Sequence, residues 1–122
     1  MRVKLIKSPK SDKKFRAVLI DINRHVDFGG KGYSDFTLHK EPERMRLYVQ
    51  RHGGLVTKKM RSIRKPKDII DSLIKVTTSD KERWSKKGID TAGFWSRWLL
   101  WSYPSLEKAK TFMSKKFDIQ FV

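Results

Sequence analysis

One stretch of the sequence, residues 44–67, carries many basic side chains and no acidic one, and we call it the basic segment. Lys and Arg side chains pair with phosphate and carboxylate groups, so this segment is the candidate binding surface for an anionic partner. Its apolar residues Leu55, Val56, Met60 and Ile63 predict that it packs partly on the body of the protein, because a disordered tail has few such anchors. Its nine basic residues are Arg44, Arg46, Arg51, Lys58, Lys59, Arg61, Arg64, Lys65 and Lys67.

The whole chain is strongly basic. Its 29 Lys and Arg residues against 13 Asp and Glu residues give a formal net charge of +16 at pH 7. Self-repulsion of that size opposes compact folding, so a partner that neutralises the charge is the natural reason for keeping it. DNA or RNA, an acidic protein surface and an anionic membrane face all qualify as that partner. A solvated basic surface without a specific partner is the less favoured alternative.

A glycine-rich loop lies between Phe28 and Ser34. Glycines allow backbone N–H groups to converge on an anion, and a lysine within the loop would add charge. The loop lacks the G-x-x-x-x-G-K-[ST] spacing of a nucleotide-binding loop, so a tight turn that needs positive φ is the favoured interpretation and a weak anion-binding loop the alternative. The residues in question are Gly29, Gly30, Lys31 and Gly32.

No constellation for catalysis or metal binding stands out. The three histidines, His25, His39 and His52, form no recognisable zinc-binding pair, and neither G-x-S-x-G nor H-E-x-x-H occurs. The absence of cysteine excludes disulfides, thiolate nucleophiles and Cys-based zinc sites, and it favours a reducing compartment. We therefore expect a protein that is not an enzyme, with no cofactor, no metal and no small-molecule substrate.

A group of aromatic residues follows in the second half of the chain. On a helix over residues 92–101 three of them share one face, and a helix this apolar is usually buried in its own core or in an interface. Tryptophan rings also stack on nucleic-acid bases, but general burial tendencies favour the core. The interface or core residues are Trp84, Phe94, Trp95, Trp98 and Trp101.

The length fits one domain, so we expect residues 1–122 to form a single basic domain, with 53–81 as a connecting segment of open role. The patterns predict an α+β fold, in which a small antiparallel sheet of about three to four strands packs with three to four short helices, one of them Trp-rich. The expected strands are a meander of 3–7, 15–22 and 25–28 and a closing strand at 117–121, and the expected helices are 42–52, 68–76, 92–101 and one capped by Ser105.

Two stretches of the chain carry a resemblance to a known family. The first is residues 32–44 with Tyr48, Arg51 and His52. The second is Trp84 with residues 88–101 and 104–106, which include the unusual string Thr-Ala-Gly-Phe-Trp-Ser-Arg-Trp. Over residues 28–52 and 84–117 the chain resembles small basic proteins of the nucleocytoplasmic large DNA viruses of algae and amoebae.

That resemblance implies a viral protein carried in the particle, and it supplies no catalytic residues. The first hypothesis is therefore a minor capsid or other shell-associated structural protein of a giant virus, located in the virion and, during assembly, in the host cytoplasm or nucleus. Its partners would be capsid or other virion proteins, or an anionic inner membrane surface. The alternative is a protein that binds the viral genome without sequence specificity, since no base-reading motif occurs.

Overall fold

The computed structural model describes all of residues 1–122 and has the α+β architecture expected from the sequence. Strands β1 (Arg2–Lys7), β2 (Lys13–Leu19) and β3 (Arg24–Gly30) form an antiparallel meander. The short strand β4 (Gln120–Phe121) returns the C-terminus to the N-terminal strand and pairs with β1 in parallel, which makes the sheet mixed. The strand order is β3-β2-β1-β4.

Two strands are shorter than the sequence predicts. The second strand ends at Leu19 because Ile20–Ile22 form a 3-10 turn, which Asn23 closes in the left-handed conformation with φ 52°. Asp21 in this turn accepts hydrogen bonds from the backbone and side chain of Arg2. The closing strand shrinks to Gln120–Phe121 because the preceding helix continues through residue 117.

Six α-helices complete the fold: α1 (Phe36–His39), α2 (Pro42–Arg51), α3 (Lys58–Ser62), α4 (Pro66–Ile74), α5 (Ala92–Trp95) and α6 (Leu106–Phe117). A π-helical turn, Ser96–Leu100, continues directly from α5. Thr91 and Ser105 cap α5 and α6 by accepting backbone N–H groups, as their position before apolar runs predicts. None of these helices combines the length and apolarity that crossing a membrane requires.

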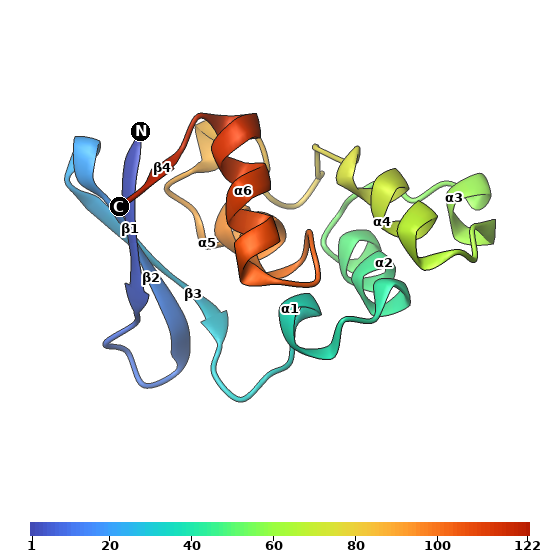
Figure 1. Ribbon diagram of the computed structural model, residues 1–122, viewed down its shortest axis with the longest axis horizontal. Coiled ribbons are helices and arrows are strands. Elements are labelled where there is room, and N and C mark those ends of the chain that lie inside the picture. The colour runs from blue at the N-terminus through green and yellow to red at the C-terminus, as the bar shows by residue number, and fades with distance from the viewer.

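The sheet lies at one end of the molecule with α5 and α6 beside it, and α2, α3 and α4 occupy the other end (Figure 1). Strand alternation directs Val3, Ala17, Leu19, Val26 and Phe28 into the core, where all are buried. The same apolar cluster continues through α5 and α6 into α2 and α4, so the whole chain shares one core.

Four of the five aromatic residues singled out above lie in that core. Trp84, Phe94, Trp95 and Trp98 are at most 1% exposed. The indole nitrogens of Trp95 and Trp98 donate to the carbonyl oxygens of Ile89 and Trp84, at 2.7 and 2.8 Å, so their polar atoms are satisfied inside. These rings are packing groups and present no surface to a partner.

Arg97 links the two ends of the molecule from inside the core. It is fully buried, and its guanidinium donates to the carbonyl oxygens of Trp101 and of Leu73 in α4, at 2.6 and 2.8 Å. It also lies 4.3 Å from the centre of the Trp98 ring, which favours a cation. Burial lowers the pKa of Arg97 to about 9, which leaves it protonated at neutral pH.

Candidate functional site

Six cations of the basic segment gather at the end of the molecule farthest from the sheet, on α3, on the start of α4 and between them (Figure 1). Thr57 caps α3 by accepting the Met60 N–H at 3.2 Å, and Pro66 begins α4. Two short helices joined by a tight connection therefore display these side chains outward. All six are exposed: Lys58, Lys59, Arg61, Arg64, Lys65 and Lys67.

These six cations are nearly free of acidic partners. Lys67 lies 3.9 Å from Asp71, and both side chains of this pair are exposed, so the pairing is weak. The other five make no salt bridge within 4.0 Å. Arg61 and Arg64 each donate one N–H to a nearby carbonyl oxygen, of Val56 and Arg61, which leaves most of their five donors available.

The basic segment packs on the body of the protein through its apolar residues. Val56 is buried and Met60 and Ile63 are half-buried against the core, but Leu55 is 75% exposed and does not act as an anchor. Arg46 completes the attachment, because its guanidinium donates to the carbonyl oxygens of Met60 and Ile63 at 3.0 and 2.9 Å. Arg46 is therefore buried and fastens α3 to α2, and it is not among the exposed cations of the basic segment.

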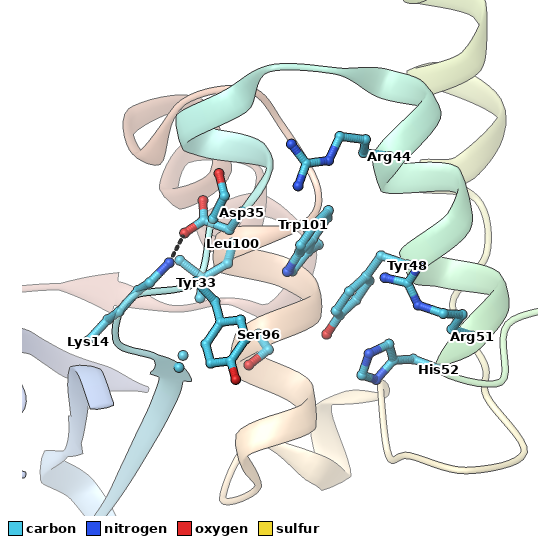
Figure 2. Close-up of a pocket in the computed structure, with 13 residues that line it drawn as sticks. Lys14, Tyr33, Asp35, Arg44, Tyr48, Arg51, His52, Ser96, Leu100 and Trp101 are labelled. Carbon is cyan, nitrogen blue, oxygen red and sulfur yellow. Dashed lines mark hydrogen bonds and ion pairs between the residues drawn. The ribbon is translucent and has the colours of Figure 1, made fainter. Parts of the chain in front are cut away.

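A second feature, which we call the aromatic pocket, opens between the end of β3, helix α2 and the π-helical turn (Figure 2). Its volume is about 450 Å³, within the range of ligand sites. Helix α2 contributes Arg44, Tyr48 and Arg51, whose spacings of four and three residues place them on one face. Two basic-segment residues, Arg44 and Arg51, thus line this pocket.

Stacked rings form one side of the aromatic pocket. The Trp101 and Tyr48 rings lie 4.3 Å apart between centres and almost parallel, at 5°. The His52 ring stacks on Tyr48 at 4.0 Å. Burial raises the pKa of Tyr48, so its hydroxyl remains a hydrogen-bond donor at any physiological pH. Trp101 is the one tryptophan that is only half-buried, and it reaches the pocket from the end of the π-helical turn.

Tyr33 stands on the other side of the aromatic pocket and is 77% exposed. A Cβ atom on Gly30 would lie 2.8 Å from Cδ2 of Tyr33, so glycine is what allows the ring to lie against the strand end. Gly29 and Gly32 adopt φ values of +79° and +91°, as the tight-turn interpretation requires.

Two backbone amides of the glycine loop are already hydrogen-bonded within the protein. The N–H of Lys31 donates to the Asp12 carbonyl at 3.0 Å, and that of Tyr33 donates to the Gly30 carbonyl at 3.2 Å. Because these two donors are already used, the structure favours the tight-turn interpretation over the anion-binding alternative. The loop instead supplies Gly29 and Gly30 to the wall of the aromatic pocket.

The charge of the aromatic pocket is positive. Of its three cations, Lys14 is paired with the buried carboxylate of Asp35 at 2.6 Å, and the other two are Arg44 and Arg51. Arg44 lies 3.3 Å from the exposed Glu41, and Arg51 has no acidic partner within 4.0 Å. Three cations and one acid leave a net charge of +2 on the lining.

The three histidines lie in different parts of the structure and have different partners. Nδ1 of His39 accepts the Glu41 N–H at 3.0 Å, and burial lowers the pKa of His39, which favours its neutral form. Nδ1 of His52 lies 3.2 Å from Glu82, and His25 lies on the sheet 3.9 Å from Asp27. No group of three or more His, Asp or Glu side chains is placed to hold a metal ion.

Sequence reasoning identified the exposed cations but not the aromatic pocket. The pocket combines Lys14, Tyr33, Tyr48 and Trp101, which come from four separate parts of the chain. The only local signal was the shared helical face of residues 44, 48 and 51. Its other walls depend on how the sheet, α2 and the π-helical turn pack together.

These features define the class of the molecule as a small basic α+β protein with a cation-rich end and a cationic, ring-lined pocket. Residues 3–52 match the model of a family described as a family of unknown function (DUF5754). The matched residues run from β1 through α2 and include ten of the thirteen residues that line the aromatic pocket. No curated protein matches the chain. No solved structure matches it either.

Proposed function

We propose that this protein is a non-enzymatic nucleic-acid-binding protein that holds phosphate groups without reading sequence. The observation that carries the proposal is the cation-rich end, where six exposed Lys and Arg side chains make a single weak ion pair, that of Lys67 with Asp71. Lys and Arg neutralise backbone phosphates and release counterions, and this gives affinity for DNA or RNA of any sequence.

The attachment of the cation-rich end supports binding by a preformed surface. Arg46 and the apolar residues Val56, Met60 and Ile63 fix α3 on the body of the protein. A fixed array of cations loses less conformational entropy on binding than a disordered basic tail, which must be ordered at the same time.

Fluorescence anisotropy with labelled oligonucleotides of unrelated sequence tests the proposal. We expect similar affinities for different sequences and a steep, linear decrease of log K with log salt. A polyglutamate peptide serves as the competing anionic partner. Oligonucleotide binding that does not depend on salt would overturn the proposal. Displacement of the labelled oligonucleotide by polyglutamate, but not by unlabelled nucleic acid, would overturn it as well.

A second candidate function is that of a minor capsid protein or another structural component of a virus particle. The resemblance to small basic proteins of nucleocytoplasmic large DNA viruses implies this role. Exposed leucines next to the cations favour it: Leu47 is 54% exposed between Arg44 and Arg51 on α2, and Leu55 is 75% exposed. Exposed apolar side chains beside arginine suit a protein interface, because the core of an interface is more apolar than the rest of the surface and arginine is enriched there. This role can be tested by mass spectrometry of purified particles of a virus that encodes the chain. Absence of the protein from the particles would exclude a structural role.

A further inference from the structure

We infer that the aromatic pocket binds one nucleoside phosphate, with its base against Tyr33 and its phosphate at Arg44 and Arg51. This inference rests on the proposed nucleic-acid binding and specifies where an unpaired nucleotide would be held. The same chemistry is offered by an unpaired base within a strand and by a free nucleotide, and the experiment below separates these two sources.

Tyr33 is the most exposed ring in this pocket. Tyr48 is stacked between Trp101 and His52, so both of its faces are already occupied. Tyr33 makes no aromatic contact of that kind and is 77% exposed, with Gly30 beneath it. A planar base would therefore stack on Tyr33, and stacking of this kind is tolerant of base identity because every base has a π-face.

Polar groups face the space beside Tyr33. Figure 2 shows the Tyr48 hydroxyl directed into the pocket, and Ser96 also belongs to the pocket lining. The raised pKa of Tyr48 keeps its hydroxyl able to donate to a ring nitrogen or carbonyl oxygen of a base. These two hydroxyls supply hydrogen bonds at the edge of a base, while Tyr33 supplies the stacking surface.

The cations of the pocket are placed to hold the phosphate. Lys14 is committed to Asp35, which also accepts the Thr37 N–H at 2.9 Å. Arg51 has no acidic partner and Arg44 only an exposed one, so these two guanidiniums remain available. A guanidinium presents a planar fork that matches the oxygens of a phosphate group.

Helix α2 contacts both the aromatic pocket and the cation-rich end. Arg44 and Arg51 lie on α2, and Arg46 on the same helix fastens α3 to it. Arg46 lies on the other side of α2 from Arg44 and Tyr48, so a single strand whose phosphates lie on α3 and α4 would pass around α2 to reach the pocket. A base that is paired in a duplex is not free to enter, so the pocket predicts a preference for unpaired nucleic acid.

The decisive experiment compares an adenine 12-mer with an abasic strand of the same length, together with adenosine and its 5′-monophosphate. We expect wild-type protein to bind the adenine strand at least about fivefold tighter than the abasic strand. Tyr33→Ala should remove this preference without changing the salt dependence, and Tyr33→Phe should keep it. Because Tyr33 is exposed, neither substitution disturbs the core.

The free ligands identify the source of the nucleotide. Quenching of the half-buried Trp101, with Trp101→Phe as the control that removes the signal, reports occupancy of the pocket. Saturable quenching by the monophosphate but not by adenosine supports a free nucleotide, whereas quenching by the adenine strand alone supports a base within a strand. In both cases the quenching should be lost in Tyr33→Ala.

Failure of the inference differs from failure of the proposed function. Equal, salt-dependent affinity for adenine and abasic strands, with no quenching by the monophosphate, would overturn the nucleotide site and leave phosphate binding intact. Absence of binding to every strand and every free ligand would overturn both.

Discussion

Neutralising the cation-rich end should flatten the salt dependence of DNA binding. The change is replacement by Gln of Lys58, Lys59, Arg61, Arg64, Lys65 and Lys67, all exposed. If each contacts one phosphate, the six together contribute about −5 to the slope of log K against log salt, because each neutralised phosphate of duplex DNA contributes about −0.9. Between about 50 and 200 mM salt this contribution equals an affinity loss of about 10³-fold, which anisotropy titrations resolve.

A matched variant separates local charge from total charge. It replaces by Gln six other exposed lysines without ion pairs, on β1, the 3-10 turn 86–88 and α6: Lys4, Lys7, Lys86, Lys87, Lys108 and Lys115. Both variants lower the formal net charge from +16 by six. We expect the control to keep most of the slope. Equal flattening in both variants would refute a local binding surface, and an unchanged slope in the first would refute phosphate contact there.

Three further predictions concern buried or paired charges. Arg46→Met should expose the bonds after residues 58, 59 and 61 to faster trypsin cleavage, because α3 loses its two hydrogen bonds to α2. Arg97→Ala should lower the free energy of unfolding by about 3 kcal/mol or more, measured by urea denaturation, because it leaves buried carbonyls unpaired and a cavity. The Arg16 hydrogen bond lowers the pKa of Asp27 to about 2, so wild-type stability should fall as the pH decreases from about 4 to 2, and Asp27→Asn should lack this contribution.

The outcomes that would contradict these three predictions are distinct. Unchanged trypsin cleavage in the first variant would show that apolar packing alone holds α3. Unfolding of Arg97→Ala at the wild-type denaturant concentration would show that the buried carbonyl oxygens of Leu73 and Trp101 do not depend on this guanidinium. A parallel pH dependence of wild type and Asp27→Asn would show that the Arg16 pair contributes nothing to stability.

The sequence predicted the helices and strands that are long enough to show a periodic pattern of apolar residues. The meander, the helix that begins at Pro42 and the helix capped by Ser105 were each marked by alternation, a helical face or a capping residue. Helices α1 and α3 were missed because they have four and five residues, too few to show a periodic pattern. The second strand was extended too far because Ile20 and Ile22 look like core residues, yet both remain exposed at the turn.

The candidate site was predicted only in part for a related reason. Exposed cations follow from composition, and the cation-rich end is a continuous stretch of sequence. Whether one arginine points outward or inward depends on which carbonyl oxygens lie nearby, as Arg46 and Arg97 show. The aromatic pocket needs Tyr33 opposite Tyr48 and Trp101, and this arrangement exists only once the sheet and helices have packed.

Backbone amide NMR during titration with a 12-nucleotide single strand tests the central claim most directly, because it locates the contact surface on the intact chain. We expect the largest chemical-shift changes in the basic segment, residues 44–67, and around Tyr33, with little change on the outer side of β1. Shifts concentrated on the sheet or on α6, or spread evenly over the surface, would contradict a dedicated cation-rich binding surface.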